Sequence, residues 1–234
     1  NLPAIALDPD GASLEFGGVG NGKLNVYAGL THSGIYVPTG SFFTMGASNA
    51  TLFVQGAAKN GANSGAAVGG ARNVGSGTIT VNAGVFSVYG ANESAAIGVG
   101  LVNGETPPDV GPITINGGTV TAHSSSWASG IGGGVAYNTR GADMTSFTMN
   151  GGSLAVNGVQ AVAIGGATGG RTSSGCRGGI LRRFKMTGGT ISARTSRNTT
   201  DLPSNFACAV IGGGPSRNED CAVGGGAELI EITG

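Results

Sequence analysis

The segment Ile113-Thr-Ile-Asn-Gly-Gly-Thr-Val-Thr-Ala122 is followed, after a short loop, by Gly130-Ile-Gly-Gly-Gly134. The same phrase returns as Phe147-Thr-Met-Asn-Gly-Gly-Ser-Leu-Ala-Val156, and Ala163-Ile-Gly-Gly166 follows it. In both copies, apolar residues stand two positions apart before and after the Asn-Gly-Gly turn. This is the period of a strand with one buried and one exposed face. The repeating unit is therefore two strands joined by a tight turn, followed by a short third strand.

The unit recurs along most of the chain, and only the loops between its strands change in length. The third strand of each copy contains an aliphatic residue, and successive copies of this residue lie 29 to 47 positions apart. These residues are Ile35, Val68, Ile97, Ile131, Ile164 and Ile211. Constant strands with variable loops are typical of solenoids, in which each coil packs on the next. We therefore predict an all-β fold, a right-handed parallel β-helix (β-solenoid) with about seven coils and three sheets.

Glycine accounts for 48 of the 234 residues, about three times its usual share. It disfavours helices by about 1 kcal/mol per residue relative to alanine, and it accepts the positive φ that sharp corners require. We expect Gly117-Gly118, Gly151-Gly152 and Gly188-Gly189 to stack at one corner of the coil, and the Ile-Gly-Gly glycines to do so at another. The glycines do not occupy every third position, so the chain is not a collagen.

One domain is expected, with residues 1–10 as an N-terminal segment, 11–227 as coils and 228–234 as the start of a further coil. The first ten residues lack the basic and apolar regions of a signal peptide and an initiator Met, which suggests a processed chain or a piece of a longer one. There is no run of 18 apolar residues, so no membrane span is expected.

The charges argue against a nucleic-acid partner and single out one region. The chain has 12 Lys and Arg against 12 Asp and Glu, so its formal net charge is zero, whereas nucleic-acid binding needs net or local positive charge. Within residues 171–218, eight basic residues stand against Asp201 alone. We predict a patch there that binds an anionic glycan or the acidic end of a neighbouring subunit. The candidate residues are Arg171, Arg177, Arg182, Arg183, Lys185, Arg194 and Arg197.

A second interpretation of these bases is purely structural. Residues 219–234 contain four acids and no base. The basic residues would then form a solvated face that pairs locally with those acids. The acids are Glu219, Asp220, Glu228 and Glu231.

Polar residues between the inward-facing ones are expected to form ladders on the outside of the solenoid. The first strands contribute Glu15, Thr44, Thr80, Thr114, Thr148, Lys185 and Glu231, and the turns after them contribute Asn82, Asn116 and Asn150. The structural explanation is that Thr favours strands, while Asn tolerates turns and can stack its amides. A flat hydroxyl array could instead bind ice or a crystalline polysaccharide.

Three cysteines are too few for a disulfide scaffold. Cys176 and Cys221 occupy similar loop positions on adjacent coils and are our candidate disulfide; a Cys208–Cys221 pair is the alternative, and Cys208 otherwise fits a small buried residue. The sequons at Asn49, Asn92 and Asn198 permit glycosylation of a secreted protein.

The sequence does not predict a catalytic centre. Polysaccharide-cleaving β-helices need grouped carboxylates, whereas the acids here fall mainly in loops or turns: Asp8, Asp10, Glu93, Glu105, Asp109, Asp143 and Asp201. Neither His32 nor His123 aligns beside a cysteine, so no catalytic thiol is expected. Trp127 is the only Trp, and Tyr89 and Tyr137 are the other aromatic residues expected in loops. We expect no enzyme, no metal site and no cofactor.

The Ile-Gly-Gly-Gly and Thr-Ile-Asn-Gly-Gly-Thr phrases resemble those of glycine-rich repeat proteins of microbial cell surfaces, right-handed β-helices related to pectate-lyase-like solenoids. The resemblance covers residues 11–234 and rests on core and turn residues, so it implies the fold more than the activity. Some relatives are labelled carbohydrate-binding or adhesive, and no catalytic motif of the lyases maps onto this chain. The resemblance implies an extracellular location.

These observations lead to one expected function and one alternative. We expect a non-catalytic structural or adhesive solenoid at the cell surface, which could assemble head to tail into a filament or coat. The alternative is a polysaccharide-binding module, or a lyase or hydrolase of the β-helix type, that acts on anionic glycans.

Overall fold

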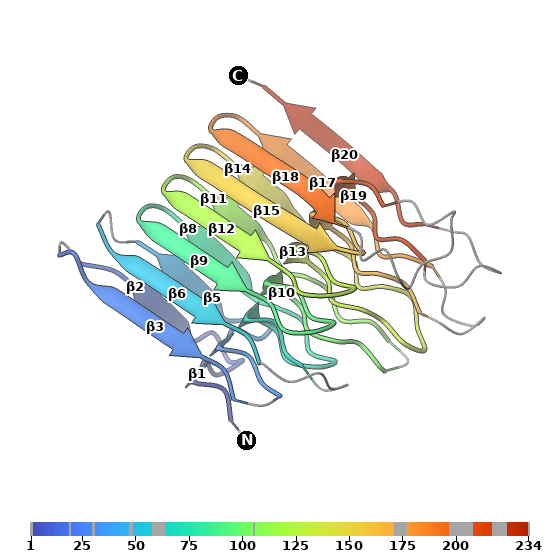
Figure 1. Ribbon diagram of the computed structural model, residues 1–234, viewed down its shortest axis with the longest axis horizontal. Helices are drawn as coiled ribbons and strands as arrows, with labels where there is room; N and C mark the ends of the chain where they lie inside the picture. The colour runs from blue at the N-terminus through green and yellow to red at the C-terminus, as the bar shows by residue number, and fades with distance from the viewer. Residues whose placement is uncertain are drawn as a thin grey trace.

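The computed structural model describes residues 2–18, 20–29, 31–46, 49–57, 64–104, 106–170, 177–196, 208–216 and 224–233. These residues form strands and turns, and no helix occurs among them. The strands build three parallel sheets that wind into a β-solenoid, with the N-terminus near one end of the stack and the C-terminus at the other (Figure 1). The prediction of an all-β solenoid with three sheets is confirmed.

Each sheet collects the equivalent strand of successive coils. Sheet 1 consists of β2 (Ser13–Phe16), β5 (Phe42–Met45), β8 (Thr78–Val81), β11 (Ile113–Ile115), β14 (Phe147–Met149), β17 (Leu181–Met186) and β20 (Ala227–Ile232). Sheet 2 consists of β3 (Lys23–Tyr27), β6 (Thr51–Gln55), β9 (Val85–Tyr89), β12 (Thr119–His123), β15 (Ser153–Val159) and β18 (Thr190–Ser196). Sheet 3 consists of β1 (Ile5–Ala6), β4 (Ile35–Tyr36), β7 (Val68–Gly69), β10 (Ile97–Gly98), β13 (Ile131–Gly132), β16 (Ile164–Gly165) and β19 (Ile211–Gly212).

The number of coils is slightly lower than expected. Successive triplets of strands run from β2–β4 to β17–β19, and between the first and the last triplet the chain makes about 5 turns. Among the described strands, β1 and β20 stand outside these triplets, because each belongs to a coil of which no other strand is described. β1 lies within residues 1–10, which the sequence placed before the coils, and it pairs with β4.

The register of the sheets confirms the alignment of the repeats. Thr80 pairs with Thr44 on one side and with Thr114 on the other, and Thr114 pairs with Thr148. In sheet 3, Ile131 pairs with Ile97 and Ile164 in the same way. The sequence could predict this register because a shift of one residue would turn every core side chain toward the solvent.

The core is a continuous apolar column along the solenoid axis. Its largest buried side chains are phenylalanines: the tilted rings of Phe43 and Phe86 are 5.7 Å apart, and the stacked rings of Phe147 and Phe184 are 5.5 Å apart. These four side chains are at most 1% exposed. Phe147 and Phe184 are equivalent residues of sheet 1, whereas Phe43 and Phe86 come from sheets 1 and 2, so the core is packed both along the column and across the coil.

Glycine columns form two corners of the coil, as predicted. Between sheets 1 and 2, Gly118, Gly152 and Gly189 have φ values of 82° to 88°. At the end of the third strands, Gly132 has a φ of 137°, and a Cβ atom on it would lie only 1.8 Å from the carbonyl oxygen of Gly165 in the next coil. At this second corner the backbones of adjacent coils lie too close together for any side chain.

Candidate functional site

Three of the predicted basic residues lie on one strand, β17, but two of them are paired with acids. Arg182 Nη2 lies 2.9 Å from Asp143 Oδ2, and its Nη1 lies 3.6 Å from Glu228 Oε1. Arg183 Nη2 lies 2.8 Å from Glu231 Oε2. The local pairing with Glu228 and Glu231 that the structural interpretation required is present. Most of the positive charge of Arg182 and Arg183 is therefore balanced within the chain.

Asp143 is the centre of the ion cluster, a role that no sequence motif predicts. Its side chain is 2% exposed and also accepts hydrogen bonds from Arg140 Nη1 at 2.7 Å and from the Ile180 backbone N–H at 2.8 Å. Arg140 and Ile180 both donate to Oδ1 and Arg182 donates to Oδ2, so both buried carboxylate oxygens have partners. The carboxylate thus joins the segment before β14 to the start of β17.

The remaining predicted basic residues are spread over two sheets. Lys185 lies on the outward face of β17, and Arg194 is exposed on β18. Arg177 is exposed before β17, whereas Arg171 and Arg197 lie outside the described residues. The Arg183 hydrogen bond lowers the pKa of the Glu231 carboxyl below its usual value, aided by the nearby charges of Arg183 and Lys185.

The polar ladders of sheet 1 are present, and their amides are bonded to one another. Asn116 Nδ2 donates to Asn82 Oδ1, and Asn150 Nδ2 donates to Asn116 Oδ1, both at 2.8 Å. Thr187 Oγ1 closes the series with a 2.8 Å hydrogen bond to Asn150 Oδ1. These contacts support the structural explanation of the asparagines, which hold successive turns in register.

Sheet 2 contains a partly exposed ladder of rings that the sequence analysis missed. The ring centroids of Tyr27 and Phe53 are 5.8 Å apart, those of Phe53 and Tyr89 are 5.5 Å apart, and those of Tyr89 and His123 are 5.5 Å apart. Tyr89 was expected in a loop but is the last residue of β9. The ladder was hidden because Tyr27 pairs in register with Gln55 and not with Phe53.

A second buried acid, Glu93, is also satisfied internally. It is 7% exposed and accepts a hydrogen bond of 2.5 Å from the Tyr137 hydroxyl. Asp143 and Glu93 are thus bound to other side chains of the fold. No group of three or more His, Cys, Asp or Glu suited to a metal ion occurs within the described ranges.

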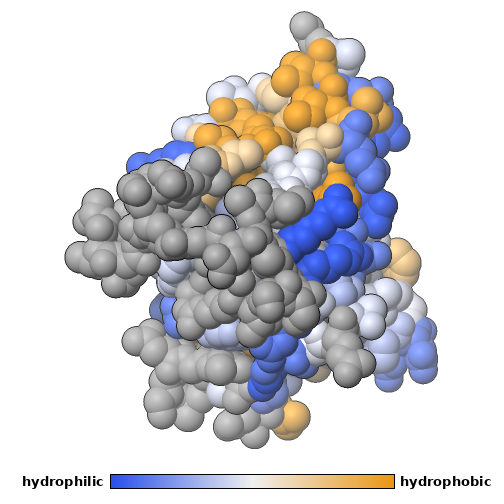
Figure 2. All heavy atoms as spheres, turned by 90° about the vertical axis from the view of Figure 1, so that its right-hand side faces the viewer, coloured by the Kyte–Doolittle hydropathy of each residue, from blue (hydrophilic) through white to orange (hydrophobic). Residues whose placement is uncertain are grey.

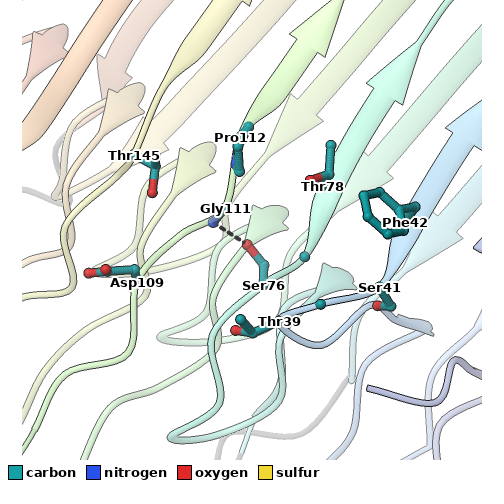
Figure 3. A pocket seen from close by; sticks show the side chains of 11 residues that line it. Thr39, Ser41, Phe42, Ser76, Thr78, Asp109, Gly111, Pro112 and Thr145 are labelled. Carbon is teal, nitrogen blue, oxygen red and sulfur yellow. Dashed lines mark hydrogen bonds between the residues drawn. The ribbon is translucent and has the colours of Figure 1, made fainter. Parts of the chain in front are cut away.

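A groove crosses the start of sheet 1, at the corner that each coil makes between sheets 3 and 1 (Figure 3). Its volume is about 250 Å³. Four successive coils contribute to its wall: the residues are Thr39–Phe42, Ser76–Thr78, then Asp109, Gly111 and Pro112, and finally Thr145. Hydroxyl groups, one carboxylate and one exposed ring therefore surround a single elongated depression.

The last described strand of sheet 1, β20, leaves apolar side chains exposed. β20 pairs with β17 along one edge, and no described strand pairs with its other edge. Leu229, Ile230 and Ile232 are 45%, 52% and 71% exposed, although the last two occupy the column that is buried in the central coils. Figure 2 shows apolar surface gathered at the top of the molecule, at the height of β20 in Figure 1.

The predicted modification sites are only partly described. Asn49 is exposed just before β6, and Asn92 is half-buried and forms a bridge with Ser126. Cys208 is half-buried and not fully buried as expected. Asn198, Cys176 and Cys221 lie outside the described residues.

Neither a family model, nor a curated protein, nor a solved structure matches this chain. A search of the described residues for a helix long and apolar enough to cross a membrane finds none.

Proposed function

We propose that this protein is a non-catalytic structural or adhesive solenoid of the cell exterior, and that copies of it stack head to tail. The observation that carries the proposal is the exposed apolar surface of β20. In the column of Ile230, the preceding residues Phe147 and Phe184 are 0% and 1% exposed, whereas Ile230 itself is 52% exposed. Burial of such side chains on a further strand would contribute about 25 cal/mol per Å² of apolar surface removed from water.

The backbone of β20 supports the same conclusion. Its outer edge presents N–H and C=O groups that no described strand satisfies, and such an edge readily pairs with a strand of another chain. At the other end of sheet 1, β2 pairs only with β5 among the described strands. Docking of β20 on β2 of a second copy would place Ile230 over Leu14 and Ile232 over Phe16, which continues both core columns.

The extracellular assignment rests on the repeat. The fold is a parallel solenoid, and its glycine-rich phrases resemble those of glycine-rich repeat proteins of microbial cell surfaces. Extended solenoids with exposed loops suit adhesion or the formation of a coat, because the rod holds variable loops at regular intervals.

Sedimentation velocity over a wide range of protein concentration, followed by negative-stain electron microscopy, tests the stacking. We expect the mass to increase with concentration and the particles to be end-to-end rods. The double variant Ile230→Lys/Ile232→Lys should remain monomeric, because it places two charges in the contact. The control Val85→Lys changes an apolar residue of sheet 2 that is 42% exposed and should assemble like the unmodified protein. A protein that stays monomeric at every concentration would refute the proposal.

A further inference from the structure

We propose that the groove at the start of sheet 1 binds an uncharged polysaccharide chain. This site lies on the side of the solenoid and is independent of the stacking proposed for its end. Figure 3 shows Phe42 and Asp109 on opposite sides of the groove, with Thr39, Ser76 and Thr78 between them.

The floor of the groove is fixed by internal hydrogen bonds. The buried Ser41 hydroxyl donates to the Pro38 carbonyl at 2.7 Å, and the buried Ser76 hydroxyl accepts from the Gly111 backbone N–H at 3.0 Å. A Cβ atom on Gly77 would lie 2.1 Å from the carbonyl oxygen of Ser41. The backbone at Gly77 is therefore closely packed, and the floor is held in place before any ligand arrives, which reduces the entropic cost of binding.

The groups that face the solvent are suited to sugar hydroxyls and sugar rings. Thr39, Thr78 and Thr145 supply hydroxyls that form no side-chain hydrogen bond within the described residues, and Asp109 supplies a carboxylate without an ion pair there. Hydroxyls both donate and accept, and an ionised carboxylate accepts up to four hydrogen bonds. The Phe42 ring is 47% exposed and offers an apolar surface to the C–H face of a sugar.

The charge of the groove selects against an anionic ligand. Within the part of the chain that the structure describes, the lining contains Asp109 but no Lys, Arg or His. A carboxylate without a cation nearby repels an anionic chain, whereas it forms charge-assisted hydrogen bonds with neutral hydroxyls. Asp109 is also the only carboxylate of the lining among the described residues, which therefore do not supply the pair of acids that glycoside hydrolysis needs. The chemistry favours binding without cleavage.

The shape of the groove favours a chain over a compact ligand. Phe42 pairs in register with Thr78, and Pro112 occupies the next place in this outward column, directly before the Ile113–Ile79 pair. Thr145 comes from the coil after that. Since neighbouring strands are about 4.8 Å apart, the lining runs parallel to the solenoid axis for roughly three coil spacings, and an extended polymer can follow it.

Affinity electrophoresis in gels that contain a polysaccharide tests this inference. The probes are hydroxyethyl cellulose and galactomannan, which are uncharged, and polygalacturonate, which is anionic. At least one uncharged probe should retard the protein, with little change between low and high salt. Phe42→Ala and Asp109→Asn should each weaken this retardation by about tenfold, the effect of one charge-assisted hydrogen bond or one well-packed ring.

Two matched variants control for indirect effects. Val85→Ala removes another exposed apolar side chain, and Asp10→Asn neutralises another exposed carboxylate; neither lines the groove, and both should bind like the unmodified protein. The inference is overturned if no uncharged probe retards the protein, or if Phe42→Ala and Asp109→Asn bind as the controls do. Retardation by polygalacturonate alone, lost at high salt, would overturn it as well and would point to the bases around β17. The stacking proposal is unaffected by any of these results, because it is measured without polysaccharide.

Discussion

The guanidinium of Arg182 lies 2.9 Å from the carboxylate of Asp143, 39 positions earlier in the chain. The same guanidinium reaches Glu228 on β20 at 3.6 Å, so one side chain connects three consecutive coils on the outside of sheet 1. Arg182 is 45% exposed, whereas Asp143 is 2% exposed. The two partners therefore differ in how much the fold depends on them.

Asp143→Asn should destabilise the protein more than the removal of either arginine. The variant replaces a buried acceptor of three hydrogen bonds, two of them from charged donors, and the expected loss is about 2–3 kcal/mol. Arg140→Gln and Arg182→Gln change half-exposed partners and should each cost less than about 1 kcal/mol. Urea unfolding followed by circular dichroism measures all three free energies of unfolding.

The exposed residue Asp109 provides the matched control for this series. Asp109→Asn makes the same chemical change outside the ion cluster, and a change within about 0.5 kcal/mol is expected. If Asp143→Asn proves as mild as Asp109→Asn, the cluster is not a determinant of stability.

Gly132→Ala should prevent the protein from folding, or destabilise it by more than about 4 kcal/mol. The added Cβ would meet the Gly165 carbonyl oxygen at 1.8 Å, and the residue would also have to adopt a φ of 137°. The Cβ would be attached directly to the backbone of one coil, and the carbonyl oxygen belongs to the backbone of the next. The clash can therefore be relieved only by separating the coils. Soluble yield and the thermal unfolding midpoint report the outcome.

Gly22→Ala is the corresponding control. A Cβ on Gly22 meets no atom within 4 Å, and its φ is not in the positive region. The midpoint should stay within a few degrees of the unmodified value. Equal effects of Gly132→Ala and Gly22→Ala would contradict the role of the glycine column.

The sequence predicted the strands and their register because strict alternation and the aliphatic column leave one alignment of the repeats. Thr44, Thr80, Thr114 and Thr148 pair as expected for this reason. The interactions between columns could not be predicted in the same way. The contact of Tyr27 with Phe53 crosses from one outward column to another, and the position of Asp143 depends on loops whose length varies from coil to coil.

The residues of the candidate site could likewise be predicted only in part. Lys185 and Arg183 could be placed on one strand from the repeat alone, but the partner of Arg182 could not. Phe42 and Asp109 face one groove because two coils of the solenoid bring residues 67 positions apart to the same corner. That proximity depends on the course of the loop before β11, for which the sequence offers no periodic signal.

Phe53→Ala should destabilise the ring ladder of sheet 2 about twice as much as Tyr27→Ala. Phe53 contacts a ring on each side, at 5.8 Å and 5.5 Å, whereas Tyr27 contacts one. Each aromatic pair contributes about 0.5–1.5 kcal/mol beyond its buried area, so losses of roughly 1–3 and 0.5–1.5 kcal/mol are expected. Urea unfolding gives both values; a larger loss for Tyr27→Ala would rule out a contribution from the stack as such.

The His123 imidazole should titrate below its ordinary pKa of 6.5. Burial is the main cause and the positive charge of Arg194 the second, since both disfavour the imidazolium. Titration of the imidazole C–H resonances by NMR measures this pKa directly. Arg194→Gln should raise it only part of the way back, because burial against Tyr89 remains.

The sign of the effect on stability follows from the same shift. Because the pKa is lower in the folded state, the unfolded chain binds more protons than the folded chain at mildly acidic pH. The contribution of neutral His123 to the free energy of unfolding is therefore fully present above pH 6.5 and is lost as the pH falls through and below that value. His123→Gln should remove this part of the pH dependence, while Arg194→Gln should shrink it. If the pKa of His123 is the same with and without Arg194, the charge of Arg194 does not reach the ring, and burial alone would account for the shift.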